Sequence, residues 1–101
     1  VMRDLDPLLH SQLRLAVVSI LMTVEEADFV YLKEKTNSTA GNLSVQLDKL
    51  SAAGYIVAER TLDGKHTRTV CRMTDVGRKA FEDYVDALKD YLNTPHNHPI
   101  R

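Results

Sequence analysis

The sequence contains little of what secreted or membrane-spanning chains depend on. It has one cysteine, Cys71, no tryptophan, and only four glycines and three prolines among its 101 residues. A single cysteine excludes an intramolecular disulfide framework, and no apolar run approaches the roughly 18 residues that a membrane span requires. The first residues also lack the charged and then apolar pattern of a signal peptide. We therefore expect one small cytoplasmic domain with no membrane partner.

Motifs of catalysis and cofactor binding are also missing. The sequence has no phosphate-binding loop, no dinucleotide fingerprint, and no serine, histidine and acid grouping in a motif context. His10, His96 and His98 do not supply the three or four well-placed ligands that a zinc site needs. Cys71 has no second cysteine with which to form a redox pair, so we expect a small buried side chain there. The sequence thus predicts no enzyme, no cofactor and no metal.

The formal net charge of −1 hides an uneven distribution along the chain. Residues 55–73 carry four basic and two acidic side chains, whereas residues 75–92 carry three basic and five acidic ones. The attraction of a polyanion depends on where the charge lies more than on the total. The segment 55–73 is therefore the part of the chain that favours contact with a phosphate backbone.

Capping residues divide the first half of the chain into three predicted helices. Short polar side chains favour helix starts, and glycine or asparagine favours helix ends. The predicted starts are Asp6–Pro7, Asp28, and Ser38 or Thr39, and the predicted ends lie near Thr36–Asn37 and at Gly54. The third of these helices has Leu43, Leu47 and Leu50 on one face, which we expect to be buried.

The second half predicts a hairpin and a last helix. Residues 55–61 and 67–73 are rich in β-branched side chains, and Asp63–Gly64 between them is a tight-turn signal. Thr74 then caps a helix that runs to Leu92. The order of helix, helix, helix, hairpin, helix is that of a winged helix-turn-helix, a mainly helical α+β fold. We expect this domain to span residues 1–92 and residues 93–101 to form a disordered tail.

The third predicted helix has a polar face suited to a DNA major groove. Four residues at helical spacing form it: Asn42, Val45, Gln46 and Lys49. Side-chain amides can pair bidentately with adenine edges, a valine can meet a thymine methyl group, and a lysine can reach a phosphate. The alternative is that this face is only the solvated side of a core helix.

Neighbouring residues extend this interpretation to the phosphate backbone. Thr39 and Ser44 offer hydroxyl groups to phosphates, and Gly41 leaves room for close approach. The hairpin adds basic side chains around its turn, where a wing would meet the backbone or the minor groove. These side chains are Arg60, Lys65, His66 and Arg68. The alternative for the hairpin is a charged edge that only resists aggregation.

Five segments carry a resemblance to a known family. Residues 39–44 (TAGNLS), 47–50 (LDKL) and 53–56 (AGYI) resemble the recognition helix and first wing strand of small stand-alone winged-helix transcriptional regulators of the MarR and ArsR types. Residues 32–36 and 73–78 resemble the preceding helix and the junction after the wing, so the resemblance runs from about Leu5 to Leu92. It implies a dimer formed by the first and last helices, with the helix from Thr39 in the major groove.

The first and last helices each carry apolar residues without an obvious cover in so small a domain. These residues are Leu8, Leu15, Val18, Met22, Tyr84, Leu88, Tyr91 and Leu92, and we expect a second subunit to cover them. The predicted function is that of a homodimeric repressor of transcription on a pseudo-palindromic DNA operator. Its recognition helix is Thr39–Ala53 and its wing is Tyr55–Met73. The alternative is a winged helix that binds another protein.

Overall fold

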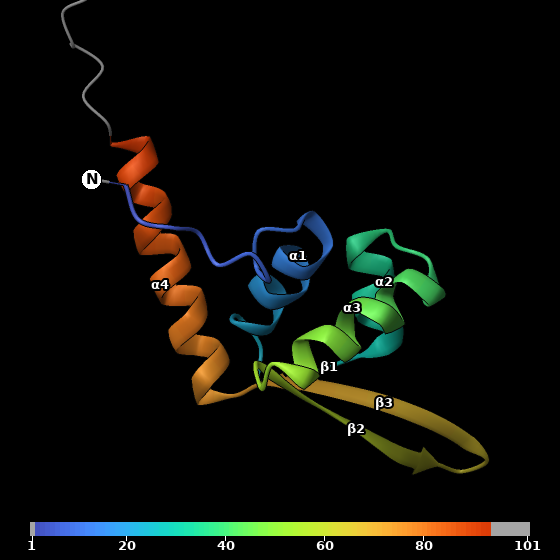
Figure 1. The fold of residues 1–101 in the computed structure, drawn as a ribbon. Coiled ribbons are helices and arrows are strands. Elements are labelled where there is room, and N and C mark those ends of the chain that lie inside the picture. The colour runs from blue at the N-terminus through green and yellow to red at the C-terminus, as the bar shows by residue number, and fades with distance from the viewer. Residues whose placement is uncertain (1, 94–101) are drawn as a thin grey trace, which may run out of the picture.

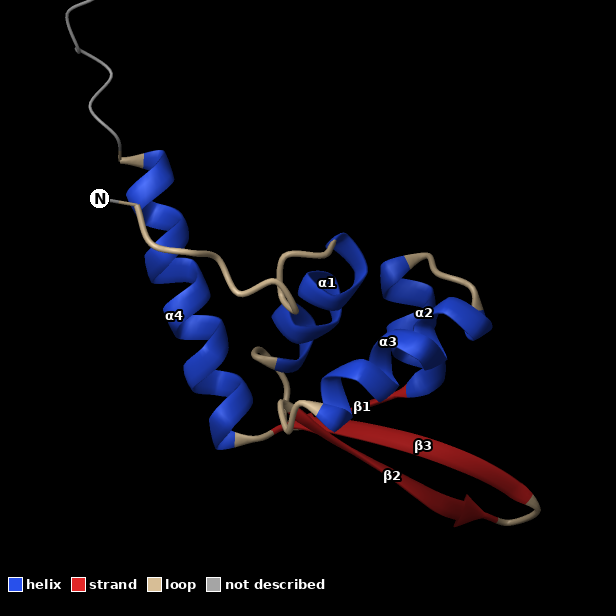
Figure 2. Ribbon diagram, in the orientation of Figure 1, coloured by secondary structure: helices blue, strands red, loops and turns tan. Residues whose placement is uncertain are grey.

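Four helices and a small sheet make up the part of the chain that the computed structural model describes, residues 2–93. Figure 2 shows the helices of the first half of the chain grouped above the sheet and the last helix on its own side of the molecule. The elements are α1 (Gln12–Leu21), β1 (Ala27–Asp28), α2 (Phe29–Thr36), α3 (Ala40–Ala52), β2 (Ile56–Asp63), β3 (His66–Met73) and α4 (Asp75–Leu92). This confirms the predicted α+β fold, mainly helical. Over the described residues, none of the helices combines the length and apolarity needed to span a membrane.

The predicted capping residues begin three of the helices. The side chain of Asp28 accepts a hydrogen bond from the Tyr31 amide at 2.8 Å, and Thr74 accepts one from the Gly77 amide at 3.0 Å. Thr39, not Ser38, caps α3. Each cap satisfies an amide that the first helical turn would otherwise leave without a partner.

Left-handed residues end α2 and α3, also as predicted. Asn37 follows α2 with φ 53°, and Gly54 follows α3 with φ 79°. Beyond Gly54 the amide of Tyr55 returns to the Leu50 carbonyl at 3.0 Å, and the Gly54 amide binds the Ser51 carbonyl at 2.9 Å. This Schellman arrangement directs the chain from α3 into the hairpin.

The start of the first helix was predicted wrongly. Asp6 does cap a turn, because its carboxylate accepts from the Leu8 amide at 2.9 Å and its carbonyl from the His10 amide at 2.9 Å. The chain then becomes extended at Ser11, with φ −147° and ψ 129°, and α1 begins only at Gln12. The Asp6–Pro7 signal is thus used by a single isolated turn, and a second start follows.

The sheet is antiparallel with the strand order β1-β3-β2, and β1 was missed by sequence reasoning. The two residues of β1 pair Ala27 with Cys71 and Asp28 with Val70. Strands β2 and β3 form the predicted hairpin, with Asp63 opposite His66 and Gly64 in the turn at φ 66°. In Figure 1 this hairpin extends well beyond the helices, past α3.

The core lies between α1, α2, α3, the base of the hairpin and α4. Its fully buried large side chains come from the turn before α1 (Leu9), from the first three helices and from β3. They include Leu21, Leu32, Leu43 and Leu50, together with Cys71. The three leucines predicted to form the buried face of α3 are confirmed, because Leu47 is 4% exposed and the other two are not exposed at all.

Two residues assigned to the subunit interface are buried inside the single chain. Val18 is 0% exposed and Tyr84 is 4% exposed. Tyr84 also places its hydroxyl 3.0 Å from Nδ1 of His10. The expectation that these two side chains need a partner subunit for cover was therefore wrong, because neighbouring parts of the same chain cover them.

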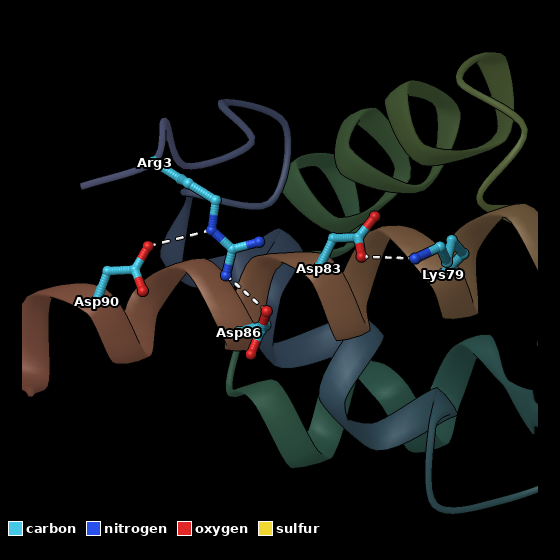
Figure 3. Close-up of polar contacts among 5 residues, drawn as sticks. All are labelled: Arg3, Lys79, Asp83, Asp86 and Asp90. Atoms are coloured by element: carbon cyan, nitrogen blue, oxygen red, sulfur yellow. Dashed lines mark hydrogen bonds and ion pairs between the residues drawn. The ribbon is translucent and has the colours of Figure 1, made fainter. Parts of the chain in front are cut away.

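The N-terminal segment runs beside α4 and is bound to it. The Arg3 guanidinium binds Asp86 at 2.6 Å and Asp90 at 3.1 Å, and Figure 3 shows it bridging these two carboxylates on the helix surface. The Tyr91 hydroxyl donates to the Arg3 carbonyl at 3.0 Å. One edge of α4 is therefore occupied by the protein's own chain.

The predicted disordered tail, with its histidines, falls almost entirely on residues 94–101, outside the described residues.

Candidate nucleic-acid interface

The face of α3 opposite its core leucines is open to solvent. Val45 on this face is 49% exposed, and the neighbouring Asn42 and Lys49 are also exposed. Gln46 is half-buried because it faces α1. The structure thus brings together on one surface of α3 the four residues predicted to face the major groove. We call this surface, formed by Asn42, Val45, Gln46 and Lys49, the reading face.

Gln46 is held by a residue that sequence reasoning missed. A guanidinium nitrogen of Arg14, in α1, donates to Gln46 Oε1, and Gln46 Nε2 donates to Asn42 Oδ1 at 2.9 Å. Arg14 is fixed in turn because its Nε donates to the Leu8 carbonyl at 2.5 Å. No local pattern could reveal this contact, since Arg14 and Gln46 lie 32 positions apart.

A groove separates α3 from the hairpin. It has a volume of about 470 Å³ and is lined from the helix by Ser44, Asp48 and Ser51, and from the hairpin by Arg60 and Thr69. Ser44 therefore lies on the hairpin side of the helix, while Asn42 and Gln46 lie on the α1 side. Asp48 was not among the predicted site residues, although its exposed carboxylate is part of the same surface.

The basic residues of the hairpin do not all face the same way. Arg60 is opposite Thr69 in the register and faces the groove, whereas Arg68 is opposite Thr61 and lies on the other face of the ribbon. Arg68 forms an ion pair with Asp28 at 3.1 Å. The Tyr31 amide and then Arg68 hold the pKa of the Asp28 carboxyl below its ordinary value. The charge of Arg68 is therefore already partly compensated.

Cations without such compensation lie closer to the reading face and at the hairpin tip. Within residues 2–93, neither Lys49 nor Arg60 forms an ion pair. Lys65 and His66 lie exposed at the turn of the hairpin. Arg60 beside α3 and Lys65 at the tip are consequently the wing cations most available to a phosphate backbone.

Gly41 and Thr39 lie at the N-terminal end of the same surface. A Cβ atom added to Gly41 would meet nothing within 4 Å, so no contact inside the protein requires a glycine there. Thr39 uses its hydroxyl oxygen to accept from the Asn42 amide at 3.2 Å, which leaves the hydroxyl hydrogen to donate outward. Both residues remain compatible with a phosphate lying close to the start of α3.

Cys71 lies in the core, as predicted, and not at the surface. It is fully buried in β3, and this burial raises the pKa of its thiol to about 11. Reactive cysteines have pKa values shifted in the opposite direction. At neutral pH Cys71 is therefore a packing residue.

An apolar strip remains on α4 where the N-terminal segment does not cover it. Phe81 and Val85 of α4, together with Met22, line a groove of about 460 Å³. Leu92 at the end of the helix is 65% exposed and Tyr91 is 38% exposed. The predicted interface residues Leu8, Leu15 and Leu88 are partly buried against the core.

Comparison with known proteins agrees with this geometry. Residues 13–92 match the family described as a winged helix DNA-binding domain. The chain is 34% identical over 76 residues to the uncharacterised protein MJ0432 of Methanocaldococcus jannaschii, an alignment that covers 75% of this chain and 83% of that protein. The structure of a transcriptional regulator homologue from Pyrococcus horikoshii superposes with a TM-score of 0.77 at 24% identity, covering 86% of this chain and 89% of that one.

A MarR-family transcriptional regulator from Silicibacter pomeroyi superposes with a TM-score of 0.64 at 22% identity. Here the match covers 87% of this chain and 62% of the other, so this chain spans less than two thirds of that regulator. The likeness to these two structures concerns the fold. The family match over residues 13–92 and the architecture in Figure 1 agree, and the chain belongs to the family of winged-helix DNA-binding domains, with a MarR-like fold.

Proposed function

We propose that the protein is a homodimeric regulator of transcription, acting as a repressor, which reads double-stranded DNA with α3 in the major groove and the hairpin on the backbone or in the minor groove. The observation that carries the proposal is the exposed polar face of α3, with an uncompensated cation at Lys49 and a projecting basic hairpin beside it. Helices of this kind fit a major groove, and basic hairpins fit the neighbouring phosphates.

The second subunit is proposed to cover the apolar strip of Met22, Phe81 and Val85 on α4. Charged neighbours such as Asp86 and Lys89 rim this strip, as is common at interfaces. Sedimentation equilibrium is expected to give twice the chain mass of 11.4 kDa. Val85→Asp is expected to return the protein to single chains, and a wild-type protein that sediments as a single chain at every concentration would contradict the dimer.

Two copies of α3 related by a twofold axis would enter successive major grooves on one side of the duplex. The operator is therefore expected to be a pseudo-palindrome whose half-sites lie roughly 10 base pairs apart, or a small multiple of that distance. Selection of bound duplexes from a random pool tests this directly. A recovered consensus without twofold symmetry would contradict the arrangement.

The dependence of affinity on salt separates DNA binding from protein binding. Lys49→Ala and Lys65→Ala are each expected to weaken binding to all sequences alike and to reduce the salt slope by about one unit per lost phosphate contact. Lys79→Ala is the matched control, because Lys79 lies on α4 and pairs with Asp83 at 2.8 Å. If Lys49→Ala and Lys65→Ala both leave the affinity and the salt slope unchanged, the alternative of a winged helix that binds another protein is favoured.

A further inference from the structure

Arg14 of α1 determines which ends of two side-chain amides on α3, those of Gln46 and Asn42, act as acceptor and as donor. Asparagine and glutamine each carry an acceptor oxygen and a donor nitrogen, and either end can face a neighbour. A guanidinium carries only donors. The atom of Gln46 that faces Arg14 must therefore be Oε1.

This constraint passes from residue to residue along the helix. With its oxygen turned to Arg14, Gln46 presents Nε2 to Asn42, so the Asn42 atom that receives this bond at 2.9 Å must be the oxygen Oδ1. The Asn42 nitrogen Nδ2 is then the free end, and it forms no hydrogen bond within residues 2–93. Asn42 itself is exposed on the reading face.

We infer that Arg14 acts as a specificity-determining residue: through Gln46 it turns the Asn42 amide so that a donor faces the DNA and selects a base edge rich in acceptors. The inference rests on the proposed function. Guanine offers two acceptors in the major groove, whereas the bidentate contact to adenine needs a donor and an acceptor from one amide. The half-site position that Asn42 reads is therefore guanine, which differs from the adenine expected for a free amide.

The decisive variant is Gln46→Glu. A carboxylate carries only acceptors, so residue 46 would still pair with Arg14 but would now draw Asn42 Nδ2 toward itself and leave Oδ1 facing outward. The exposed end of Asn42 would change from donor to acceptor. The preferred base is then expected to change from guanine to one that presents a donor, cytosine or adenine.

The experiment is a selection of bound duplexes from a random pool, carried out with the full chain and its variants. Asn42→Ala identifies the symmetric pair of positions that this residue reads, because the preference relaxes there. Wild type is expected to prefer guanine at that pair by about tenfold, as for one well-placed base contact. Gln46→Glu is expected to reverse the preference, while its added charge lowers the affinity for all sequences alike.

Two further variants control for folding and for mere packing. Arg14→Lys keeps a hydrogen-bond donor at this place, so the preference for guanine is expected to remain. Arg14→Met keeps an apolar stem without donors, so adenine is expected to be accepted at the same position. Both alter the bond to the Leu8 carbonyl, so their thermal unfolding is measured alongside; Gln46→Glu leaves that bond intact. The same base in wild type and Gln46→Glu would overturn the inference alone. Loss of any consensus for wild type would instead overturn the proposed function on which it rests.

Discussion

The glycine at the junction between the hairpin and α4 allows a sharp test of how the fold is held together. A Cβ atom added to Gly77 would lie 2.1 Å from the Tyr55 carbonyl oxygen and 2.7 Å from Cε of Met73. The Tyr55 oxygen is backbone and accepts hydrogen bonds from the Thr74 amide and hydroxyl, both at 3.1 Å. The added atom therefore requires the α4 helix to move by about an ångström against these bonds.

The expected cost follows from these contacts. Overpacking of this kind costs about 1–3 kcal/mol, and each weakened hydrogen bond about 1 kcal/mol, against a gain of about 1 kcal/mol from alanine in a helix. Gly77→Ala is thus expected to lower the free energy of unfolding by about 2–4 kcal/mol. In a chain of this size the melting temperature would fall by roughly 10–25 °C.

The control is the same substitution where the structure leaves space. Gly41 is also helical, and an added Cβ there would meet nothing within 4 Å. Gly41→Ala is therefore expected to raise the free energy of unfolding by up to about 1 kcal/mol through helix propensity. Thermal unfolding followed by circular dichroism at one protein concentration compares the two. Equal shifts for both variants, or a stabilised Gly77→Ala protein, would refute the packing argument.

Three other predictions each concern one residue. The hydroxyl of Tyr55 donates to the Asp6 carboxylate at 2.5 Å, and this bond raises the pKa of Tyr55 to about 12. The contribution of the bond to the free energy of unfolding is complete below the ordinary pKa of 10 and is lost as the pH rises through 12. In urea unfolding, Tyr55→Phe should therefore lower the free energy of unfolding by about 1–2 kcal/mol at pH 7 but not above pH 12. Asp28→Asn keeps the cap on α2 but breaks the ion pair with Arg68, so binding to DNA duplexes of random sequence should strengthen and its dependence on salt should steepen. An unchanged salt dependence would show that Arg68 does not contact the phosphate backbone. Gly41→Ala should weaken DNA binding, although it stabilises the fold, because the added methyl group occupies the space proposed for a DNA phosphate. Unchanged affinity would show that no phosphate lies close to the start of α3.

Local signals predicted most of the fold. Thr39, Thr74 and Asp28 act within three residues of themselves, so their roles as caps follow from the sequence alone. Strand β1 was missed because two residues form no periodic pattern and become a strand only through their partners in β3. Helix α1 was predicted to begin too early because the Asp6–Pro7 signal does not tell whether one turn or a whole helix follows.

Long-range contacts explain the remaining differences. Periodicity identified Val18 as apolar on a second side of α1, but it cannot say whether the same chain or a partner covers that side; here the same chain does. The polar face of α3 was predicted residue by residue. Its connection to Arg14 was not, because that contact joins two helices far apart in the sequence.

The burial of Cys71 makes the rest of the molecule accessible to selective labelling. The chain has no other cysteine, and the thiol of this one lies in the core with its pKa raised to about 11. A maleimide dye at neutral pH reacts with an exposed thiolate far faster than with a buried thiol. Lys65→Cys would therefore attach one dye at the hairpin tip without first replacing the native cysteine. Fluorescence from that position would report, in solution and in real time, when the tip of the hairpin meets a DNA duplex.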